Sequence, residues 1–221
     1  MTHTTEDRTP SDTRPTVDPD SIPHEEARGA RIPVLGFGTW QLTGPRCVDD
    51  VADALAMGYR HLDTARHYGN EAQVGEGIRR SGIDPDEIWI TSKVWWEDLD
   101  REERTREEAL ASLDALGLDS LDLMLVHWPD TDGDMRPAFT ALRRLRDEGR
   151  IRHIGVSNFT PTMVDEALEQ ADIVCNQVEY HPYLSQDAVL EQARERDLVV
   201  TAYSPLARGE VTDDDTLREI A

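Results

Sequence analysis

The stretch Leu123-Met124-Leu125-Val126-His127 decides the fold, because four large apolar residues follow one another and a histidine ends the run. A strand with one face in water alternates apolar and polar side chains, whereas a strand of a parallel sheet is covered on both faces and is apolar throughout. The run therefore predicts a buried strand of a parallel sheet. Six further apolar runs occur along the chain, and the seven expected strands span residues 33–40, 60–64, 88–93, 121–128, 151–156, 173–178 and 198–203.

Helical patterns separate these strands. Thr160 followed by Pro161 is a typical helix start, and Gly82 and Gly117 stand where helices are expected to end. Alternation of strand and helix is typical of a doubly wound sheet or of a (β/α)8 barrel. The expected helices lie near residues 48–56, 70–81, 103–116, 136–149, 161–170 and 185–196.

The distribution of glycines and polar residues favours the barrel. The fingerprint GxGxxG of doubly wound dinucleotide-binding folds is absent, since Gln41 and Arg80 stand where the third glycine belongs after Gly36-Phe37-Gly38 and Gly75-Glu76-Gly77. Barrel active sites lie at the carboxyl ends of the strands. Six consecutive expected strands end in polar residues of that kind, namely Asp63, Lys93, His127, Ser157 with Asn158, Gln177 and Tyr203.

We therefore predict an α/β fold of the (β/α)8 TIM barrel type. The sequence shows seven strands, and the eighth strand and the last helices are expected to be missing from a chain that is incomplete at its C-terminal end. Residues 29–221 are assigned to this barrel domain. Residues 1–28 are rich in Thr, Pro, Asp and Glu and are predicted to form a disordered acidic tail.

The net charge of the chain argues against some classes of binding partner. The 221 residues carry 45 acidic and 23 basic side chains, a net charge of −22, which argues against binding to nucleic acid or anionic membranes. Such acidity suggests a halophilic protein from a high-salt cytoplasm, where ions screen the self-repulsion. No signal peptide or membrane-spanning run is evident, so a cytoplasmic location is expected. Cys47 and Cys175 are interpreted as reduced structural thiols.

Lys93 is the only lysine of the chain, beside 22 arginines. A lysine ammonium is a compact charge whose pKa responds to burial, which an arginine cannot replace. Asp63 ends the preceding strand and could pair with it, and His127 ends the following strand. Tyr68 lies in the loop after Asp63 and is the natural proton donor to a carbonyl oxygen. Its ordinary pKa is about 10, and we expect the ammonium of Lys93 to lower it.

These residues belong to sequence blocks that together resemble the aldo-keto reductase family. The resemblance extends from about residue 34 to 206, and the blocks are Gly36-Phe37-Gly38-Thr39-Trp40, Leu62-Asp63-Thr64-Ala65, Tyr68-Gly69-Asn70-Glu71, Thr91-Ser92-Lys93-Val94-Trp95, Leu125-Val126-His127-Trp128-Pro129, Ile154-Gly155-Val156-Ser157-Asn158-Phe159, Asn176-Gln177-Val178-Glu179-Tyr180-His181-Pro182 and Ala202-Tyr203-Ser204-Pro205-Leu206. The resemblance implies a monomeric barrel that transfers hydride from NADPH, or alternatively from NADH, to a small carbonyl substrate such as a keto acid, a glyoxal or an aldehyde.

The resemblance also implies a role for each matching residue. Asp63, Tyr68, Lys93 and His127 match the catalytic tetrad. The residues that match cofactor contacts are Ser157, Asn158 and Gln177 at the carboxamide, Tyr203 on the nicotinamide ring, Thr39, Ser204 and Leu206 elsewhere, and Arg208 and Gly209 in the loop over the pyrophosphate. The residues that match the substrate wall are Trp40, Trp95 and Trp128, with His127 beside them.

Two alternatives remain open at the level of sequence. The first is a non-enzymatic relative that senses nucleotide through the same fold. The second is a metal-dependent barrel hydrolase, in which His61, Asp63 and His67 would supply ligands. No later pair of His and Asp completes a plausible ligand set, so no metal is predicted. The N-terminal β-hairpin usual in the family is poorly recognisable in the acidic tail.

Overall fold

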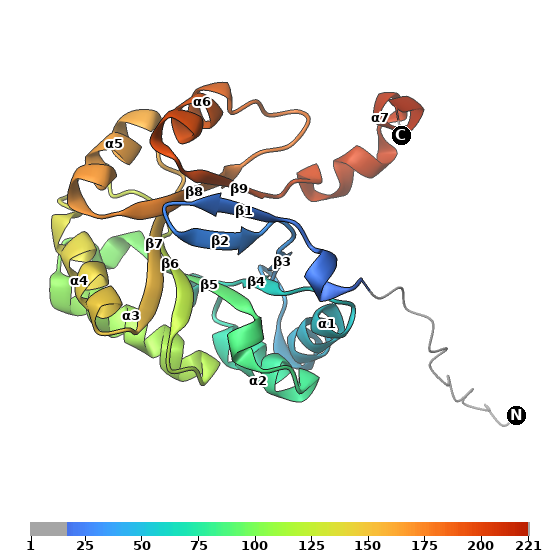
Figure 1. The fold of residues 1–221 in the computed structure, drawn as a ribbon, viewed down its shortest axis with the longest axis horizontal. Coiled ribbons are helices and arrows are strands. Elements are labelled where there is room, and N and C mark those ends of the chain that lie inside the picture. Colours follow the sequence, from blue (N-terminus) through green and yellow to red (C-terminus); the bar gives the residue numbers. More distant parts are fainter. Residues whose placement is uncertain (1–16, 221) are drawn as a thin grey trace, which may run out of the picture.

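The computed structural model describes residues 17–220 and contains a parallel sheet of seven strands, curved into a nearly closed barrel (Figure 1). The strands follow one another in space in the order of the chain, as in a (β/α) barrel. The predicted fold class is therefore confirmed. In sheet order the strands are β3 (Phe37–Gly38), β4 (His61–Asp63), β5 (Trp89–Val94), β6 (Leu121–Val126), β7 (Ile151–Ser157), β8 (Ile173–Glu179) and β9 (Val199–Tyr203).

Helices cover the outer face of this sheet (Figure 1). Thr160 begins α5 as expected, since its hydroxyl accepts a hydrogen bond from the Met163 amide at 3.4 Å. Gly82 and Gly117 end α2 and α3 in the left-handed conformation. The α-helices are α1 (Gly44–Ala56), α2 (Glu71–Ser81), α3 (Glu102–Leu116), α4 (Arg136–Asp147), α5 (Pro161–Gln170), α6 (Asp187–Arg196) and α7 (Asp215–Ile220). Short 3-10 helices are η1 (Pro19–Ser21), η2 (Arg66–Tyr68), η3 (Pro85–Glu87), η4 (Trp96–Asp98) and η5 (Ala207–Asp213).

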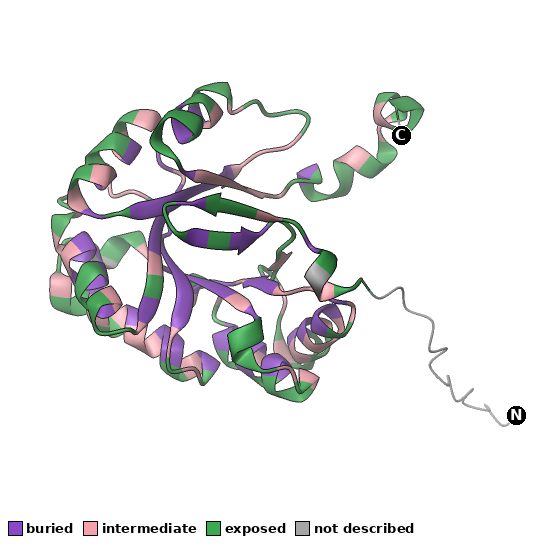
Figure 2. Ribbon diagram, viewed as in Figure 1, coloured by how far each residue is buried: buried purple, intermediate pink, exposed green. Residues whose placement is uncertain are grey.

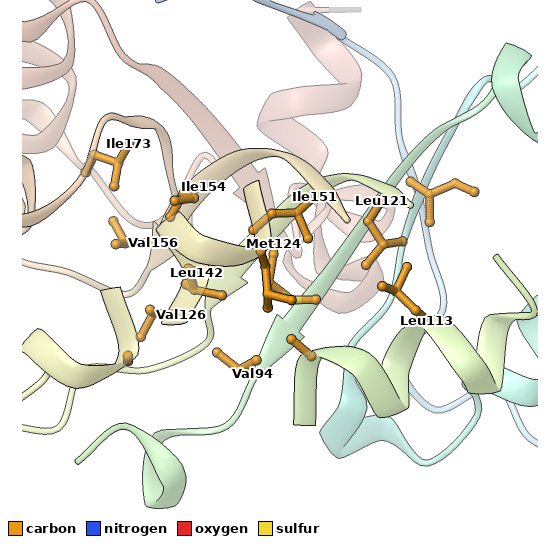
Figure 3. Packing of buried hydrophobic residues seen from close by; sticks show 14 of the residues in the cluster. Val94, Leu113, Leu121, Met124, Val126, Leu142, Ile151, Ile154, Val156 and Ile173 are labelled. Atoms are coloured by element: carbon orange, nitrogen blue, oxygen red, sulfur yellow. The ribbon is translucent and has the colours of Figure 1, made fainter. Parts of the chain in front are cut away.

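Strand β6 is buried on both faces, as its apolar run predicts (Figure 2). Met124 and Val126 point outward into the core between the sheet and the helices (Figure 3). Leu123 and Leu125 belong to a second buried cluster, which includes Ile32 of the N-terminal hairpin. The continuous apolar run thus supplies two separate cores, one inside the barrel and one outside.

The N-terminal region departs from the prediction. Strands β1 (His24–Ala27) and β2 (Ala30–Pro33) form an antiparallel hairpin, so placing all of residues 1–28 in a disordered tail was wrong for residues 19–27. The physical reason is burial: Ala30 and Ile32 pack against Leu123. The sequence did not reveal this strand, because its four residues, His-Glu-Glu-Ala, are too few and too polar to show an apolar alternation. Residues 1–16, where the rest of the predicted tail falls, lie outside the described residues.

Over the described residues, no helix has the length and apolar character needed to cross a membrane.

Candidate active site

A cavity of about 950 Å³ lies at the carboxyl ends of the barrel strands and reaches down toward the N-terminal hairpin. Leu206 and Gly209 are the two predicted cofactor residues that do not line it, and the side chain of Leu206 is 60% exposed. Lys93 lies buried beside the cavity rather than on its wall. The other predicted site residues line the cavity together: Thr39, Trp40, Asp63, Tyr68, Trp95, His127, Trp128, Ser157, Asn158, Gln177, Tyr203, Ser204 and Arg208.

Lys93 is held near the end of β5 by three acceptors. Its Nζ forms an ion pair with Asp63 and donates to the Thr64 carbonyl at 2.8 Å and to the Tyr68 hydroxyl at 3.5 Å. The residue is 1% exposed. Burial disfavours its charge, but the attraction of Asp63 and Tyr68 outweighs this and raises the pKa of Lys93. The lysine therefore remains an ammonium beneath the tyrosine.

The pKa of Tyr68 departs from the direction expected from sequence. Burial raises the pKa of Tyr68, and the charge of Lys93 opposes that rise only in part. The prediction from sequence took account of the Lys93 ammonium, which lowers the pKa, but not of the burial of the phenol, which raises it more. In the protein as described, Tyr68 therefore stays protonated at neutral pH and keeps a proton to donate.

His127 lies buried across from Tyr68, with ring centroids 5.7 Å apart and ring planes at 75°. Burial and the charge of Lys93 lower the pKa of His127 to about 3, so the imidazole is neutral at neutral pH. Its buried Nδ1 has no hydrogen-bond partner among the described residues. A neutral imidazole can donate one hydrogen bond to a carbonyl oxygen without bringing a charge.

The amide side chains link the strand ends. Gln177 Nε2 donates to Asp63 Oδ2 at 2.7 Å, and Ser157 Oγ donates to the Gln177 carbonyl at 2.9 Å. Asn158 Nδ2 donates to the His127 carbonyl at 3.0 Å, and the Tyr203 hydroxyl donates to Asn158 Oδ1 at 2.9 Å. These bonds fix β4, β6, β7, β8 and β9 in one network. The predicted contacts of these side chains with a carboxamide stay predictions, because here they bind one another.

An aromatic wall borders the catalytic groups. The rings of His67 and Trp95 stack with centroids 3.7 Å apart and planes at 7°, and Trp95 meets the His127 ring edge-on at 5.1 Å. Trp40 is 50% exposed, and the Arg208 guanidinium lies 5.5 Å from the centre of its ring. Sequence reasoning considered His67 only as a metal ligand and missed its place in this wall. Its position directly before Tyr68 was the available signal.

The metal-site alternative has no support in the geometry. Both ring nitrogens of His61 are engaged, at 3.2 Å from the Pro33 carbonyl and 3.2 Å from Thr91 Oγ1. His67 is stacked on Trp95 at the cavity wall. Within residues 17–220, no group of three or more His, Cys, Asp or Glu side chains is arranged to hold a metal ion.

Asn70 is a supporting residue whose role the sequence did not reveal. It stands at the start of α2, but its side chain makes no capping bond to the helix. Its Nδ2 donates to the carbonyls of Thr39 at 2.8 Å and Leu42 at 3.0 Å, and its Oδ1 accepts from Thr64 Oγ1 at 3.2 Å. The buried amide thus ties the turn that carries Trp40 to the strand end that supports Lys93.

Fold and site together define an α/β barrel protein in which a buried ammonium, a phenol and a neutral imidazole converge at the carboxyl ends of the strands. Comparison with known proteins identifies the family. The family model described as "Aldo/keto reductase family" matches residues 34–220. The chain belongs to the aldo/keto reductase family, and the oxidoreductase class of its members follows from that membership.

Individual relatives agree with this assignment. An uncharacterized oxidoreductase of Bacillus subtilis is 43% identical over 200 residues, which cover 87% of this chain and 71% of that protein. Glyoxal reductase of Bacillus subtilis is 40% identical over 196 residues, which cover 87% of this chain and 70% of that protein.

Solved structures give the same result. An aldo/keto reductase from Brucella melitensis superposes with a TM-score of 0.85 at 38% identity, covering 91% of this chain and 78% of that one. An aldo-keto reductase of Bombyx mori in complex with NADP superposes with a TM-score of 0.76 at 28% identity, covering 86% of this chain and 67% of that one.

Proposed function

We propose that this protein reduces small aldehydes and ketones to alcohols with NADPH, or alternatively NADH, and that Tyr68 is the general acid. The observation that carries the proposal is the arrangement of Lys93, Tyr68 and His127 around one point of the cavity wall. The glyoxal reductase relative supports the substrate class, and the Bombyx mori complex with NADP supports the choice of cofactor.

The residues present fit a nicotinamide dinucleotide. The cavity of about 950 Å³ is large enough for an extended ligand, and the ring of Tyr203 lines it as a surface on which a flat heterocycle can stack. Asn158 and Gln177 also line the cavity with their amide side chains, and Arg208 offers a permanent positive charge for a phosphate. When bound, the cofactor supplies the hydride that reduces the carbonyl carbon.

Side chains of the protein itself supply the proton. A substrate carbonyl oxygen between Tyr68 and His127 accepts a hydrogen bond from the phenol and one from the neutral imidazole. As the hydride reaches the carbon, the C=O π bond opens and the oxygen takes the phenolic proton. This leaves a tyrosinate beside the ammonium of Lys93, and Asp63 holds that ammonium in place. Lys93 therefore stabilises the charge that develops on Tyr68 in the transition state.

Turnover of the wild type and of Tyr68→Phe tests this mechanism. The oxidation of NADPH and NADH is followed with methylglyoxal and with a small aromatic aldehyde, at high and low salt. Removing the general acid should lower kcat by roughly a hundredfold or more, because a positioned acid contributes about 10²–10⁴-fold. A matched control is Tyr183→Phe, whose hydroxyl binds Asp214 at 2.7 Å outside the cavity wall.

Each outcome has a meaning. Equal rates for the wild type and Tyr68→Phe would exclude Tyr68 as the acid. Quenching of tryptophan fluorescence by NADPH without turnover by the wild type would favour the nucleotide-sensing alternative over the reductase.

A further inference from the structure

The contact between Lys93 and Tyr68 is too long to fix their separation by itself. The distance of 3.5 Å between Lys93 Nζ and the Tyr68 hydroxyl exceeds the usual range of about 2.7–3.2 Å, so this hydrogen bond is weak. Tyr68 ends η2, a single turn of 3-10 helix in which the Tyr68 amide donates to the Ala65 carbonyl at 3.0 Å. Further contacts must therefore hold the turn that carries the phenol against the strand that carries the ammonium.

Glu71 lies between these two segments. It stands in the first turn of α2 and is 3% exposed. Its Oε1 accepts a hydrogen bond of 2.6 Å from the hydroxyl of Ser92, which directly precedes Lys93 in β5. Its Oε2 lies 3.6 Å from the guanidinium of Arg66, which is two residues before Tyr68. One carboxylate thus joins the strand of the ammonium to the turn of the phenol.

These contacts form a closed ring. Successive side chains of a strand point to opposite faces, so Ser92 and Lys93 project from opposite faces of β5. From Lys93 the ring passes through Ser92, Glu71 and Arg66 to Tyr68, and it closes through the 3.5 Å contact. Ser92, Glu71 and Arg66 do not line the cavity, so they do not touch a substrate bound there. They can influence the reaction through the residues that they hold in place.

The burial of Glu71 strengthens its link to Arg66. Glu71 Oε2 is buried and has no hydrogen-bond partner among the described residues, so the guanidinium at 3.6 Å supplies the compensating charge. A buried carboxylate that loses its charged partner is strongly destabilising. Arg66 is held from the other side by Glu108 of α3, which accepts from its Nε at 3.2 Å. The ion pairs therefore resist a movement of η2 away from α2.

We infer that Glu71 is a positioning residue that sets the separation between Lys93 and Tyr68, because it holds β5 through Ser92 and η2 through Arg66. The inference rests on the proposed role of Tyr68 as general acid and adds the residue that places this acid against its ammonium. The tyrosinate that proton transfer leaves is attracted to the ammonium more strongly at a shorter distance. A misplacement of about 1 Å can cost roughly a hundredfold in rate.

Glu71→Gln tests the inference, since its amide keeps an oxygen for Ser92 but cannot form the ion pair with Arg66. The protein is loaded with NADPH and mixed with methylglyoxal, and the rate of a single turnover is measured so that product release does not contribute. We expect this rate to fall by roughly ten- to a hundredfold. The KM for methylglyoxal and the dissociation constant of NADPH, followed by quenching of tryptophan fluorescence, should not change, because Glu71 lies outside the cavity wall.

Combination with Tyr68→Phe gives a readout that a loss of stability would not reproduce. Where the phenol is absent, Glu71 has no general acid to position. Tyr68→Phe and the double variant with Glu71→Gln should therefore react at the same residual rate. A general weakening of the fold would instead lower the rate in both backgrounds.

Asp122→Asn is the matched control. Asp122 is also a buried acid that accepts a hydrogen bond from a strand, in this case from the Ile90 amide at 2.8 Å, and it pairs with Arg152 at 2.9 Å. It lies near the start of β6, at the opposite end from the site, and does not line the cavity. The exchange should lower the free energy of unfolding but leave the single-turnover rate of the folded protein unchanged.

Ser92→Ala removes the other contact of Glu71 and decides the question if Glu71→Gln does not fold. It should also lower the single-turnover rate, and it should have no effect in the Tyr68→Phe background. Wild-type rates in the variants of Glu71 and Ser92, or a further loss when either change is added to Tyr68→Phe, would overturn the inference. Absence of turnover by the wild type would instead refute the proposed reduction, so the two failures are distinguishable.

Discussion

At the scale of single residues, the retention of one lysine has a geometric explanation. The Nζ of Lys93 reaches a carboxylate, a carbonyl and a phenol from a side chain that is 1% exposed. A guanidinium is larger and planar, and it distributes its donors over a fork. In a closely packed interior it cannot occupy the same point, and it would leave donors without acceptors.

Lys93→Arg should therefore lose activity. We expect kcat to fall by roughly a hundredfold or more, since the charge beside Tyr68 is displaced and general-acid catalysis contributes about 10²–10⁴-fold. Steady-state kinetics with methylglyoxal measures the loss, and circular dichroism checks that the variant is folded. Arg106→Lys is the reverse exchange at a surface ion pair with Glu148 and should change little. Near-normal turnover of Lys93→Arg would contradict the role assigned to the lysine.

The sequence predicted which residues meet at the site but not all of their electrostatics. Asp63, Lys93 and His127 were identified from their positions at strand ends and Tyr68 from its place in the loop after Asp63, and the structure brings the four together. The net direction of the Tyr68 pKa was wrong, because it depends on burial that only the folded loop produces. The partners of Gln177 could not be predicted either, since its bond to Asp63 joins residues 114 positions apart.

At the scale of elements, the glycines of Gly75-Glu76-Gly77 have a packing role instead of the phosphate-binding role that the sequence excluded. A Cβ on Gly75 would lie 2.2 Å from the Leu116 carbonyl oxygen at the end of α3. A Cβ on Gly77 would lie 2.7 Å from the side chain of Val51 in α1. Helix α2 thus approaches both neighbouring helices closely. A single sequence shows such glycines but not the backbone that approaches them.

Gly75→Ala should test this close approach. The added methyl group meets backbone, which cannot rotate away, so α2 and α3 must separate. We expect a loss of roughly 1–3 kcal/mol or more in the free energy of unfolding, as for other overpacked interiors. Denaturant unfolding measures the change. Gly38→Ala is the control, because a Cβ there has no atom within 4 Å. Equal stabilities of the two variants would show that the packing can relax.

The structure contains the predicted strands and helices wherever the sequence shows a strong apolar periodicity. Hairpin β1–β2 was missed because its burial comes from contacts with the barrel interior, which local patterning does not encode. Strand β3 is shorter than the predicted residues 33–40, since only Phe37 and Gly38 pair with β4. Pairing of β strands depends on a neighbour that a single strand's sequence does not specify.

At the scale of the whole molecule, opposite electrostatic effects act on stability. Ion pairs join neighbouring helices, for example Arg144 of α4 with Glu102 of α3 and Arg196 of α6 with Asp165 of α5. Salt weakens such exposed attractions, which contribute little individually. The excess of acids produces repulsion that the same salt relieves, and it amounts to a net charge of −22. The response of stability to salt therefore shows which effect dominates.

We expect repulsion to dominate, so the melting temperature should rise with potassium chloride. Most of the increase should occur below about 1 M, where the screening length falls to roughly 3 Å from about 10 Å at 0.1 M. Thermal unfolding by circular dichroism measures it. A variant that removes two negative charges, with Glu166→Gln and Glu169→Gln on the exposed face of α5, should be more stable than the wild type at low salt. It should lose that advantage at high salt. A melting temperature that is constant or falls with salt would show that the ion pairs outweigh the repulsion and that the acidity does not require a saline medium.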